Sequence, residues 1–514
     1  TAAAGDAIQA DAFGGNISIV TTGAINAALV GIEANNRNGG AISILSGGSV
    51  TSGAGTNGIN ARANGAGTVT IGSTEQRTGP VVAGATGVFA TSEGDINVAV
   101  GSVTGATRGI VASNQRATGS LAVLNGRVVI DASGPVTGET SYGIIGINNG
   151  LLADNTLTIR TAGPVTSTSG SAISAQTIGG NIDITAQGSI LSNAGPTWFG
   201  DGIYAEASGT GAVSVLATGA SISGYDGIYT ATRATSGIGI DVQTTGVVSG
   251  LTQFGLYGRA LGASVNLASQ GTATGVLGGL VATTSGGSGN VTVSTANADS
   301  ANGMGVSATI TNAGTGLVRV NVTGASTVSG VTGVLATTDG SGAVTVASNT
   351  AGSRVIGTGG AGVQASANGG LLTVALAGGA TGATGHAGVS AINTGSGAVN
   401  VNVDGAVSGT TGIYAVTGTG AIDIGTAGDR STGSITANGA PGIYAATAGN
   451  IGIHVGAVST TGGNPVSFGD DRQPFPISSD SGYAILALSS AGTATINANG
   501  LVSGGAAGGI YART

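Results

Sequence analysis

A four-residue pattern recurs about nineteen times in this chain of 514 residues: Gly, then Ile, Val or Leu, then any residue, then Ala. It occurs at residues 31–34, 58–61 and 509–512, and degenerate copies stand at residues 172–175 and 484–487. Successive copies are about 28 residues apart, with a spread from about 22 to about 42. A fixed period of this size is typical of solenoids, in which one small structural unit stacks on copies of itself.

Each repeat contains three short segments with the pattern of a β-strand. The Gly-Ile-x-Ala segment is followed by a Gly-rich turn, a second alternating segment such as residues 42–44 or 344–346, and a third apolar position such as Val50 or Val165. Alternation with period two, bounded by Gly and Asn, indicates strands, and no stretch has the 3.6-residue period of a helix. We therefore predict an all-β chain that forms a right-handed parallel β-helix solenoid, with about nineteen coils of about 28 residues and three short strands per coil.

A hairpin solenoid or a propeller is the competing geometry, but propeller blades need longer strands and tight hairpin turns. The variable repeat length favours the β-helix, whose turns can project from a constant core. The alternation also predicts which side chains point inward. We expect the following residues in the core: Ile32, Ile42, Ile44, Val50, Val334 and Val344.

The repeat is continuous, so we expect residues 1–514 to form a single parallel β-helix rod, about 90 Å long at about 4.8 Å per coil. The longest step between copies places a loop insertion at residues 456–482, which we expect to project from the rod. The repeat pattern reaches both ends of the sequence. We therefore expect a segment of a longer protein or a processed mature chain.

Composition excludes several function classes. Only 7% of the residues are charged, the net charge is −8, and all fourteen basic residues are Arg, which disfavours nucleic-acid binding. The absence of Cys excludes disulfides and thiol chemistry. No run of eighteen apolar residues is present, so no membrane span is expected in this segment. The two His residues, His386 and His454, are isolated, and we expect no metal and no cofactor.

Repeats of the form Gly-Ile-Tyr-Ala, followed by Gly-x-Val-x-Val and Gly-x-Val-Ser-Gly, resemble the β-helical passenger regions of Gram-negative autotransporters and related filamentous surface adhesins. The resemblance covers essentially the whole chain, and it concerns architecture more than activity. It implies secretion to the bacterial cell surface and a role as an adhesin, a stalk or a surface fibre.

The third residue of the repeated pattern should point outward, because the flanking Ile and Ala point inward. Six of the nine tyrosines occupy this slot, which predicts an exposed aromatic stripe. One interpretation is in-register stacking that stabilises the sheet. The other is a contact surface for a glycan or a neighbouring rod. The residues of the predicted stripe are Tyr204, Tyr229, Tyr257, Tyr414, Tyr444 and Tyr511.

The loop insertion is a second candidate binding site, because it concentrates aromatic residues, charges and three of the eight prolines. A cover over an edge of the core is the alternative interpretation. A smaller candidate contains Trp198 and Phe199. The candidate binding residues of the loop insertion are Phe468, Asp470, Asp471, Arg472 and Phe475.

Five coils carry Asn or Asp after Gly in the turn before the second strand. Asn and Asp tolerate turn conformations and bond locally, so we interpret these residues as structural. They are Asn16, Asp95, Asn181, Asn290 and Asn450.

Asp183 and Asp241 stand in equivalent outward slots two coils apart, with Ser214 between them. Their expected separation of about 10 Å exceeds the roughly 6.5–9.5 Å of an inverting carboxylate pair, so we expect no enzyme. The sequence favours an extracellular structural or adhesive surface protein, either a β-helical stalk or the subunit of a cell-surface filament. The alternative is a carbohydrate-binding module or a polysaccharide-degrading β-helix enzyme. Expected partners are further copies of the chain, head-to-tail or lateral, and glycans or a host or neighbouring cell surface.

Overall fold

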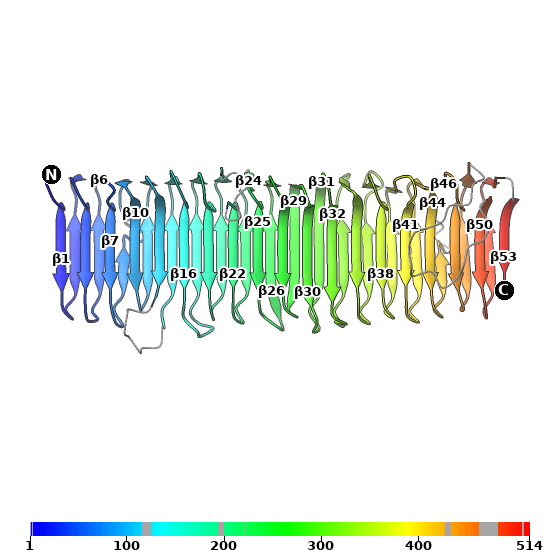
Figure 1. The fold of residues 1–514 in the computed structure, drawn as a ribbon, viewed down its shortest axis with the longest axis horizontal. Helices are drawn as coiled ribbons and strands as arrows, with labels where there is room; N and C mark the ends of the chain where they lie inside the picture. The colour runs from blue at the N-terminus through cyan, green and yellow to red at the C-terminus, as the bar shows by residue number, and fades with distance from the viewer. Residues whose placement is uncertain are drawn as a thin grey trace. The chain divides into compact units, whose positions relative to one another are not determined.

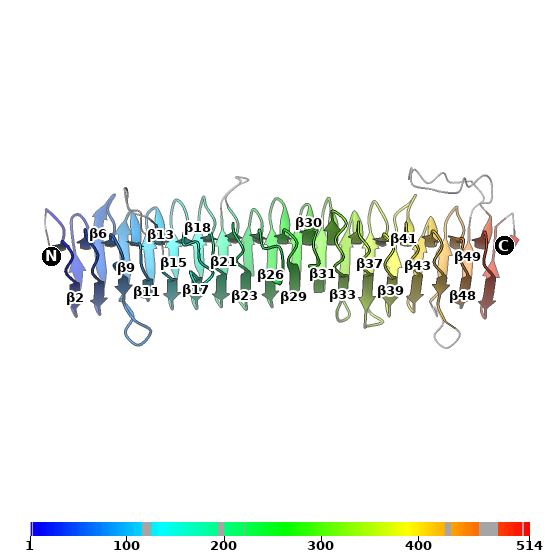
Figure 2. The same ribbon diagram turned by 90° about the horizontal axis from the view of Figure 1, so that it is seen from below.

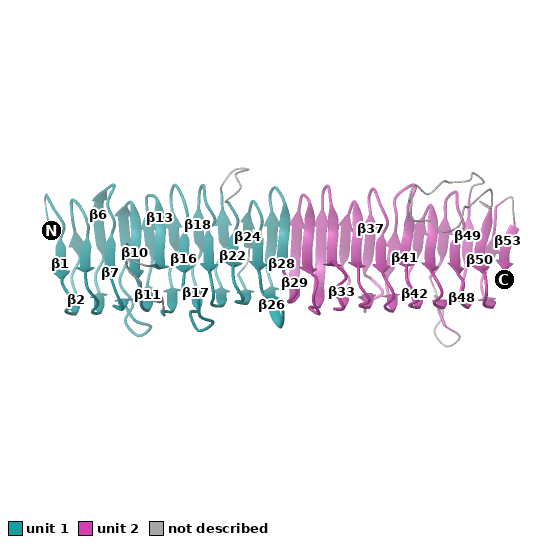
Figure 3. Cartoon of the chain, turned by 60° about the horizontal axis from the view of Figure 1, so that its bottom comes forward, with its two compact units in different colours: residues 1–260 teal, residues 261–514 magenta. Residues whose placement is uncertain are grey.

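The computed structural model describes residue 2 and residues 4–115, 125–193, 200–219, 221–426, 433–461, 482–505 and 508–514. The chain divides into two compact units, Thr1–Ala260 and Leu261–Thr514 (Figure 3). The regular structure of the described part is entirely β. No helix that could cross a membrane is found there. The single rod over residues 1–514 stays a prediction, and each unit is described by itself.

Unit 1 is a parallel β-solenoid whose Gly-Ile-x-Ala segments form the first of three ladders (Figure 1). Each strand pairs in parallel with the equivalent strand of the next coil, as in Ile8↔Ile32 and Ile32↔Ile59. The strands of this ladder are β1 (Ile8–Ala12), β4 (Ile32–Asn36), β7 (Ile59–Ala63), β10 (Thr86–Ser92), β13 (Arg108–Asn114), β16 (Ile144–Asn148), β19 (Ile173–Thr177), β22 (Ile203–Ala207), β25 (Ile228–Thr232) and β28 (Phe254–Ala260).

The second and third strands of each coil form two further parallel ladders in unit 1, and β17 and β21 can be followed in Figure 2. The second ladder contains β2 (Ile17–Thr21), β5 (Ile42–Ser46), β8 (Val69–Ile71), β11 (Ile96–Val100), β14 (Val128–Ala132), β17 (Leu157–Thr161), β20 (Ile182–Ala186), β23 (Val213–Ala217) and β26 (Ile238–Thr244). The third contains β3 (Ile25–Asn26), β6 (Val50–Ala54), β9 (Val81–Gly84), β12 (Val103–Gly105), β15 (Val136–Gly138), β18 (Val165–Ser167), β21 (Ile190–Ser192), β24 (Ser221–Gly224) and β27 (Val247–Gly250).

Unit 2 repeats the same architecture with nine described strands in its first ladder. These are β30 (Gly278–Ser285), β32 (Met304–Thr311), β35 (Thr332–Thr338), β38 (Val363–Ala367), β41 (Ala387–Asn393), β44 (Thr411–Thr417), β47 (Ile443–Thr447), β50 (Tyr483–Ser489) and β53 (Gly508–Arg513). The prediction of a parallel β-solenoid is thus confirmed. The number of coils is close to the predicted value of about nineteen.

The other strands of unit 2 follow the three-strand plan with one departure. In two coils the second and third strands merge into the long strands β29 (Ser264–Gly275) and β31 (Val291–Ser300), which pair with a register shift between Ser269 and Thr272. The remaining strands are β33 (Val318–Val322), β34 (Thr327–Gly330), β36 (Val344–Ser348), β37 (Arg354–Gly357), β39 (Leu372–Leu376), β40 (Gly379–Thr381), β42 (Val399–Val403), β43 (Val407–Gly409), β45 (Ile422–Ile424), β46 (Ile435–Ala437), β48 (Ile451–Val455), β49 (Val458–Thr460), β51 (Ala494–Ala498) and β52 (Val502–Ser503).

The core of each unit consists of the inward-facing aliphatic side chains of the three ladders. Ile32, Ile42 and Val50 of one coil are fully buried. Val334 and Val344 in unit 2 are also 0% exposed, which confirms the predicted register of inward positions. Because each coil buries its apolar face against the coils above and below, the coils stabilise one another rather than folding singly.

The Asn and Asp residues predicted in the turns have a structural role, but each side chain bonds to the neighbouring coil rather than within its own turn. In each of the five coils the side-chain oxygen accepts a hydrogen bond, 2.8–3.0 Å long, from the backbone N–H at the equivalent position one coil further on. The donor–acceptor pairs are Ala41–Asn16, Arg127–Asp95, Ala212–Asn181, Leu317–Asn290 and Thr493–Asn450. These turns therefore join coils to each other.

A second polar ladder, which the sequence analysis did not predict, lies inside the corner that follows the first strand. Asn148 Nδ2 donates to the carbonyl of Gly126 at 2.9 Å, and Thr447 Oγ1 donates to the carbonyl of Gly420 at 2.6 Å. Both side chains are buried. They satisfy turn carbonyls that would otherwise be buried without a partner, which is costly.

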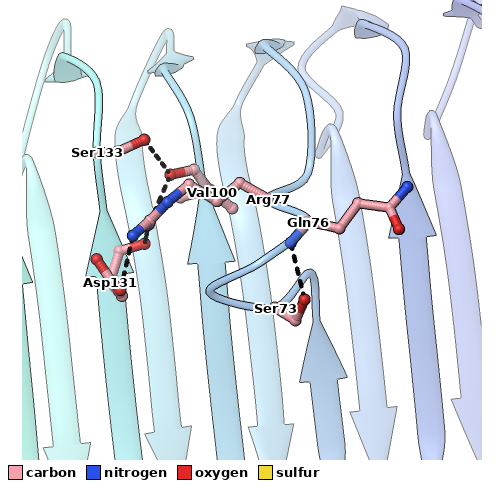
Figure 4. Close-up of polar contacts among 6 residues, drawn as sticks. All are labelled: Ser73, Gln76, Arg77, Val100, Asp131 and Ser133. Carbon is pink, nitrogen blue, oxygen red and sulfur yellow. Dashed lines mark hydrogen bonds and ion pairs between the residues drawn. The ribbon is translucent and has the colours of Figure 1, made fainter.

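One ion pair is present in the described ranges, and it ties a projecting turn of unit 1 to the sheet (Figure 4). Arg77 Nη2 lies 2.9 Å from Asp131 Oδ2 on β14, and Arg77 Nη1 donates to the carbonyl of Asp131 at 3.0 Å. The turn itself is closed by the backbone N–H of Gln76, which donates to Ser73 Oγ at 3.0 Å. The guanidinium of Arg77 thus contacts β14, which lies two coils further along the chain.

Candidate functional site

Three of the predicted tyrosines form a continuous stack on the outer face of the first ladder of unit 1. Tyr204 on β22, Tyr229 on β25 and Tyr257 on β28 are register partners. Their ring centroids are 5.2 Å apart at each step, with interplanar angles of 6° and 16°. Phe254 adds a fourth ring, 5.0 Å from Tyr257. We call Tyr204, Tyr229 and Tyr257 the tyrosine stack.

The tyrosine stack is half-buried, whereas the sequence predicted an exposed stripe. The reason is geometric. Rings that stack face to face at the coil spacing cover each other's faces, so the edges and hydroxyl groups are what remains at the surface. Tyr229 has a neighbouring ring on both sides. A ligand would therefore meet a row of ring edges and hydroxyl groups rather than open aromatic faces.

The hydroxyl groups of the tyrosine stack remain protonated at neutral pH. Burial and a hydrogen bond from its hydroxyl to the Glu206 carboxylate raise the pKa of Tyr204 above its usual range. Burial, and then the neighbouring Tyr257, raise the pKa of Tyr229 to about 12. Burial also raises the pKa of Tyr257, against the opposing effect of Arg259. The stack can donate and accept hydrogen bonds, but it does not supply a base.

Two aspartates that the sequence analysis overlooked lie at the corner that leads into this stack. The side chains of Asp201 and Asp226 are each 4% exposed. Asp201 Oδ1 accepts from the backbone N–H of Asp226 at 3.1 Å, and Asp226 Oδ1 accepts from the N–H of Phe254 at 2.8 Å. Burial and the charge of Asp226 raise the pKa of Asp201 to about 7, against the opposing effect of the hydrogen bond from the backbone N–H of Asp226. Burial raises the pKa of Asp226 to about 6, against the opposing effect of the hydrogen bond from the backbone N–H of Phe254.

The signal for this pair was present in the sequence as a repeated Asp-Gly-Ile-Tyr at residues 201–204 and 226–229. We refer to Asp201 and Asp226 as the carboxyl pair.

The tyrosines of unit 2 do not form an exposed stripe, which corrects the prediction for them. Tyr414 and Tyr444 are only 6% and 2% exposed, although their rings stack as predicted, at 5.0 Å and 7°. They belong to an apolar cluster that includes Val416 and Leu486. The outward positions of these strands carry apolar residues that pack in one cluster. Tyr511 is half-buried against this cluster and lies 5.2 Å from Tyr483.

The candidate binding residues of the predicted loop insertion lie outside the described residues, which omit 462–481. The same holds for Trp198 and Phe199, because residues 194–199 are also outside the description. Their role as a binding site stays a prediction. The residues concerned in the loop insertion are Phe468, Asp470, Asp471, Arg472 and Phe475.

The carboxylates considered for polysaccharide cleavage occupy the predicted register. Asp183 pairs with Ser214, and Ser214 pairs with Asp241, so the two carboxylates are two coils apart. Asp241 Oδ2 accepts a hydrogen bond from Gln243 Nε2 at 3.2 Å. Over the part of the chain that the structure describes, no group of three or more His, Cys, Asp or Glu side chains could hold a metal ion.

A hollow of about 160 Å³ lies on the second ladder of unit 2. Its lining includes Thr373, Asn400 and Asp423, which are successive register partners on β39, β42 and β45. The hollow thus runs from coil to coil across three strands, and Asp423 supplies the one carboxylate among the described residues that line it.

The chain matches no protein-family model, no curated protein and no solved structure.

Proposed function

We propose that this chain is an extracellular structural and adhesive protein, a β-solenoid stalk or filament subunit of the bacterial cell surface. The observation that carries the proposal is the tyrosine stack, which places aromatic edges in register at 5.2 Å steps on the outer face of unit 1. Aromatic residues with a polar tip are enriched at contact surfaces, because one end packs and the other bonds.

The scaffold supports a structural role. Backbone ladders, buried aliphatic side chains and turn bonds between coils repeat from coil to coil in each unit. The outward slots next to the core carry small polar residues, for example Asp183 and Thr185 on β20 and Asn400 and Asn402 on β42. Such a surface is hydrated without being strongly charged, and it repeats at the coil spacing. A regular face of this kind suits contact with a partner that is itself periodic.

The tyrosine stack supports an adhesive role for unit 1. Its phenols keep their protons at neutral pH, since burial raises their pKa values. Glu206 and Arg259 stand beside them on the same strands and add a carboxylate and a guanidinium. The phenols, the carboxylate and the guanidinium together form a row of hydrogen-bond donors and acceptors. Such a row suits a ligand with regularly spaced hydroxyl groups, such as a polysaccharide, or a second copy of the same face.

A polysaccharide-degrading enzyme is the alternative, and the register of Asp183 and Asp241 is the observation that bears on it. Two coils correspond to about 10 Å, beyond the roughly 6.5–9.5 Å of inverting carboxylate pairs. Release of new sugar ends from acidic polysaccharides by the purified protein would favour the enzyme over the adhesin.

The adhesive role is tested by changing Tyr204, Tyr229 and Tyr257 together to Ser. We expect loss of glycan binding on an array, or of lateral association in sedimentation velocity, with an unchanged far-UV β signal. A second variant changes the same three residues to Phe, which keeps the ring stacking and removes the hydroxyl groups, so it separates binding through the ring edges from binding through the hydroxyl groups. If the Ser variant loses thermal stability but keeps all binding and association, the stack only stabilises the sheet and the adhesive role fails.

A further inference from the structure

The residue before the first position of the repeated pattern, which is Gly or, in the first coil, Ala7, occupies a corner position that links neighbouring coils in unit 1. In four coils this slot holds an Asp or Asn whose Oδ1 accepts the backbone N–H of the equivalent residue one coil further on. The distances are 2.9 Å for Asp6 from Val30, 3.3 Å for Asn57 from Thr86, 3.1 Å for Asp201 from Asp226, and 2.8 Å for Asp226 from Phe254.

The carboxyl pair is the one place where two of these four slots fall in consecutive coils. Asp6 and Asn57 are partly exposed, whereas Asp201 and Asp226 are each 4% exposed. Equivalent positions in adjacent coils are about 4.8 Å apart. Two buried carboxylates at that separation disfavour simultaneous ionisation, and they share their protons as one coupled system.

Among the described residues, no cation lowers the pKa of Asp201 or Asp226. Tyr204, Tyr229 and Tyr257 are neutral phenols, and Glu206 adds a further negative charge beside Tyr204 and Tyr229. Arg259 acts on Tyr229 and Tyr257. Tyr225, the residue before Asp226, has its hydroxyl bonded to Gln253 Nε2 at 2.7 Å.

We propose that the carboxyl pair is a proton-dependent latch on the coils that carry the tyrosine stack: the corner is closed while the pair retains a proton and opens when both carboxyls are ionised. The strands β22 and β25 begin two residues after Asp201 and Asp226, so an open corner releases the strand starts that align Tyr204 with Tyr229.

The direction of the pH dependence follows from linkage. The pKa values of Asp201 and Asp226 are raised, to about 7 and about 6, whereas an unfolded Asp titrates near about 3.9. At pH values between about 3.9 and about 7, the carboxyl pair binds more protons in the closed form than in the open form. The closed form is therefore fully favoured below about pH 4, and this advantage is lost as the pH rises through about 6 to 7.

The test is hydrogen exchange of the whole chain, followed by mass spectrometry of peptides that cover β22 and β25, at pH 5 and pH 8. Exchange times are scaled for the chemical rate at each pH. We expect protection of these peptides to be lower at pH 8 than at pH 5 by about 100- to 1000-fold, because linkage gives a factor of about 100 for Asp201 and about 10 for Asp226. Peptides from β4 and β5 of the same unit should show no such change.

Asp201→Asn and Asp226→Asn each keep the Oδ1 acceptor and remove a charge, and Asn57 shows that an amide serves in this slot. We expect either variant to lose much less protection at pH 8 than the parent chain, with only the response of the remaining carboxyl left, about 10-fold for Asp226 in Asp201→Asn. Asp6→Asn is the matched control, because Asp6 makes the same bond without a carboxylate neighbour in the next coil, and it should behave as the parent chain. Equal protection of the parent at both pH values would overturn the proposal, as would a full pH response in both Asn variants.

Discussion

Replacing Val334 by Asp tests the inward register in the middle of unit 2. Val334 is fully buried on β35, between its register partners Val306 and Val363. Losing the buried aliphatic side chain costs about 1.5–3 kcal/mol. A carboxylate left there without a partner costs several kcal/mol more, or takes up a proton. We expect the local coils to open, because the neighbouring coils contribute much of the stability of each coil.

Leu335→Asp is the matched control for this change. Leu335 is the next residue on β35, faces outward and is half-buried, so a carboxylate there stays hydrated. The assay is limited proteolysis with the cleavage sites mapped, together with far-UV circular dichroism. Val334→Asp should create new cleavage sites within about one coil of residue 334, and Leu335→Asp should leave the parent pattern. Equal cleavage of the two variants would refute the inward assignment of Val334.

Two further predictions concern bonds between coils and between chains. Asn181→Ala removes the acceptor for the N–H of Ala212 and should cost about 0.5–1.5 kcal/mol, measurable as a lower urea midpoint, whereas Asn181→Asp should retain most of the stability. In a polypeptide made as residues 1–514 alone, β1 and β53 each pair with one described strand, and open edges recruit further strands, so we expect this polypeptide to associate head-to-tail into filaments. Sedimentation at rising concentration and electron microscopy check this, and a chain that stays monomeric without end-to-end particles contradicts it.

The architecture could be predicted because its signal is repeated many times. The period placed the strands, and the alternation within each strand placed Val334 and Val344 in the core. Gly-Asn dipeptides also marked the turns correctly, as at Asn181. Its partner one coil away was not predicted, because a turn preference describes one residue, whereas the acceptor bond depends on the stacking of two coils.

The candidate site was harder to predict, because exposure depends on what surrounds a slot rather than on the slot itself. The same outward position is half-buried at Tyr229 and almost fully buried at Tyr444, which packs in an apolar cluster. Asp201 and Asp226 were overlooked for a similar reason. A single Asp before Gly indicates an ordinary turn, and only the stacking of two such turns makes them a buried pair.

The bonds of this fold join a residue to its counterpart one repeat away, and this has a consequence for the gene. Loss of the codons for residues 31–57 would bring β7 against β1, with Ile59 opposite Ile8 in place of Ile32. The new neighbours carry the same pattern, so the ladder would continue without a change of register. Recombination between repeats can therefore lengthen or shorten such a protein in whole coils, about 4.8 Å at a time, while the remaining coils keep their contacts.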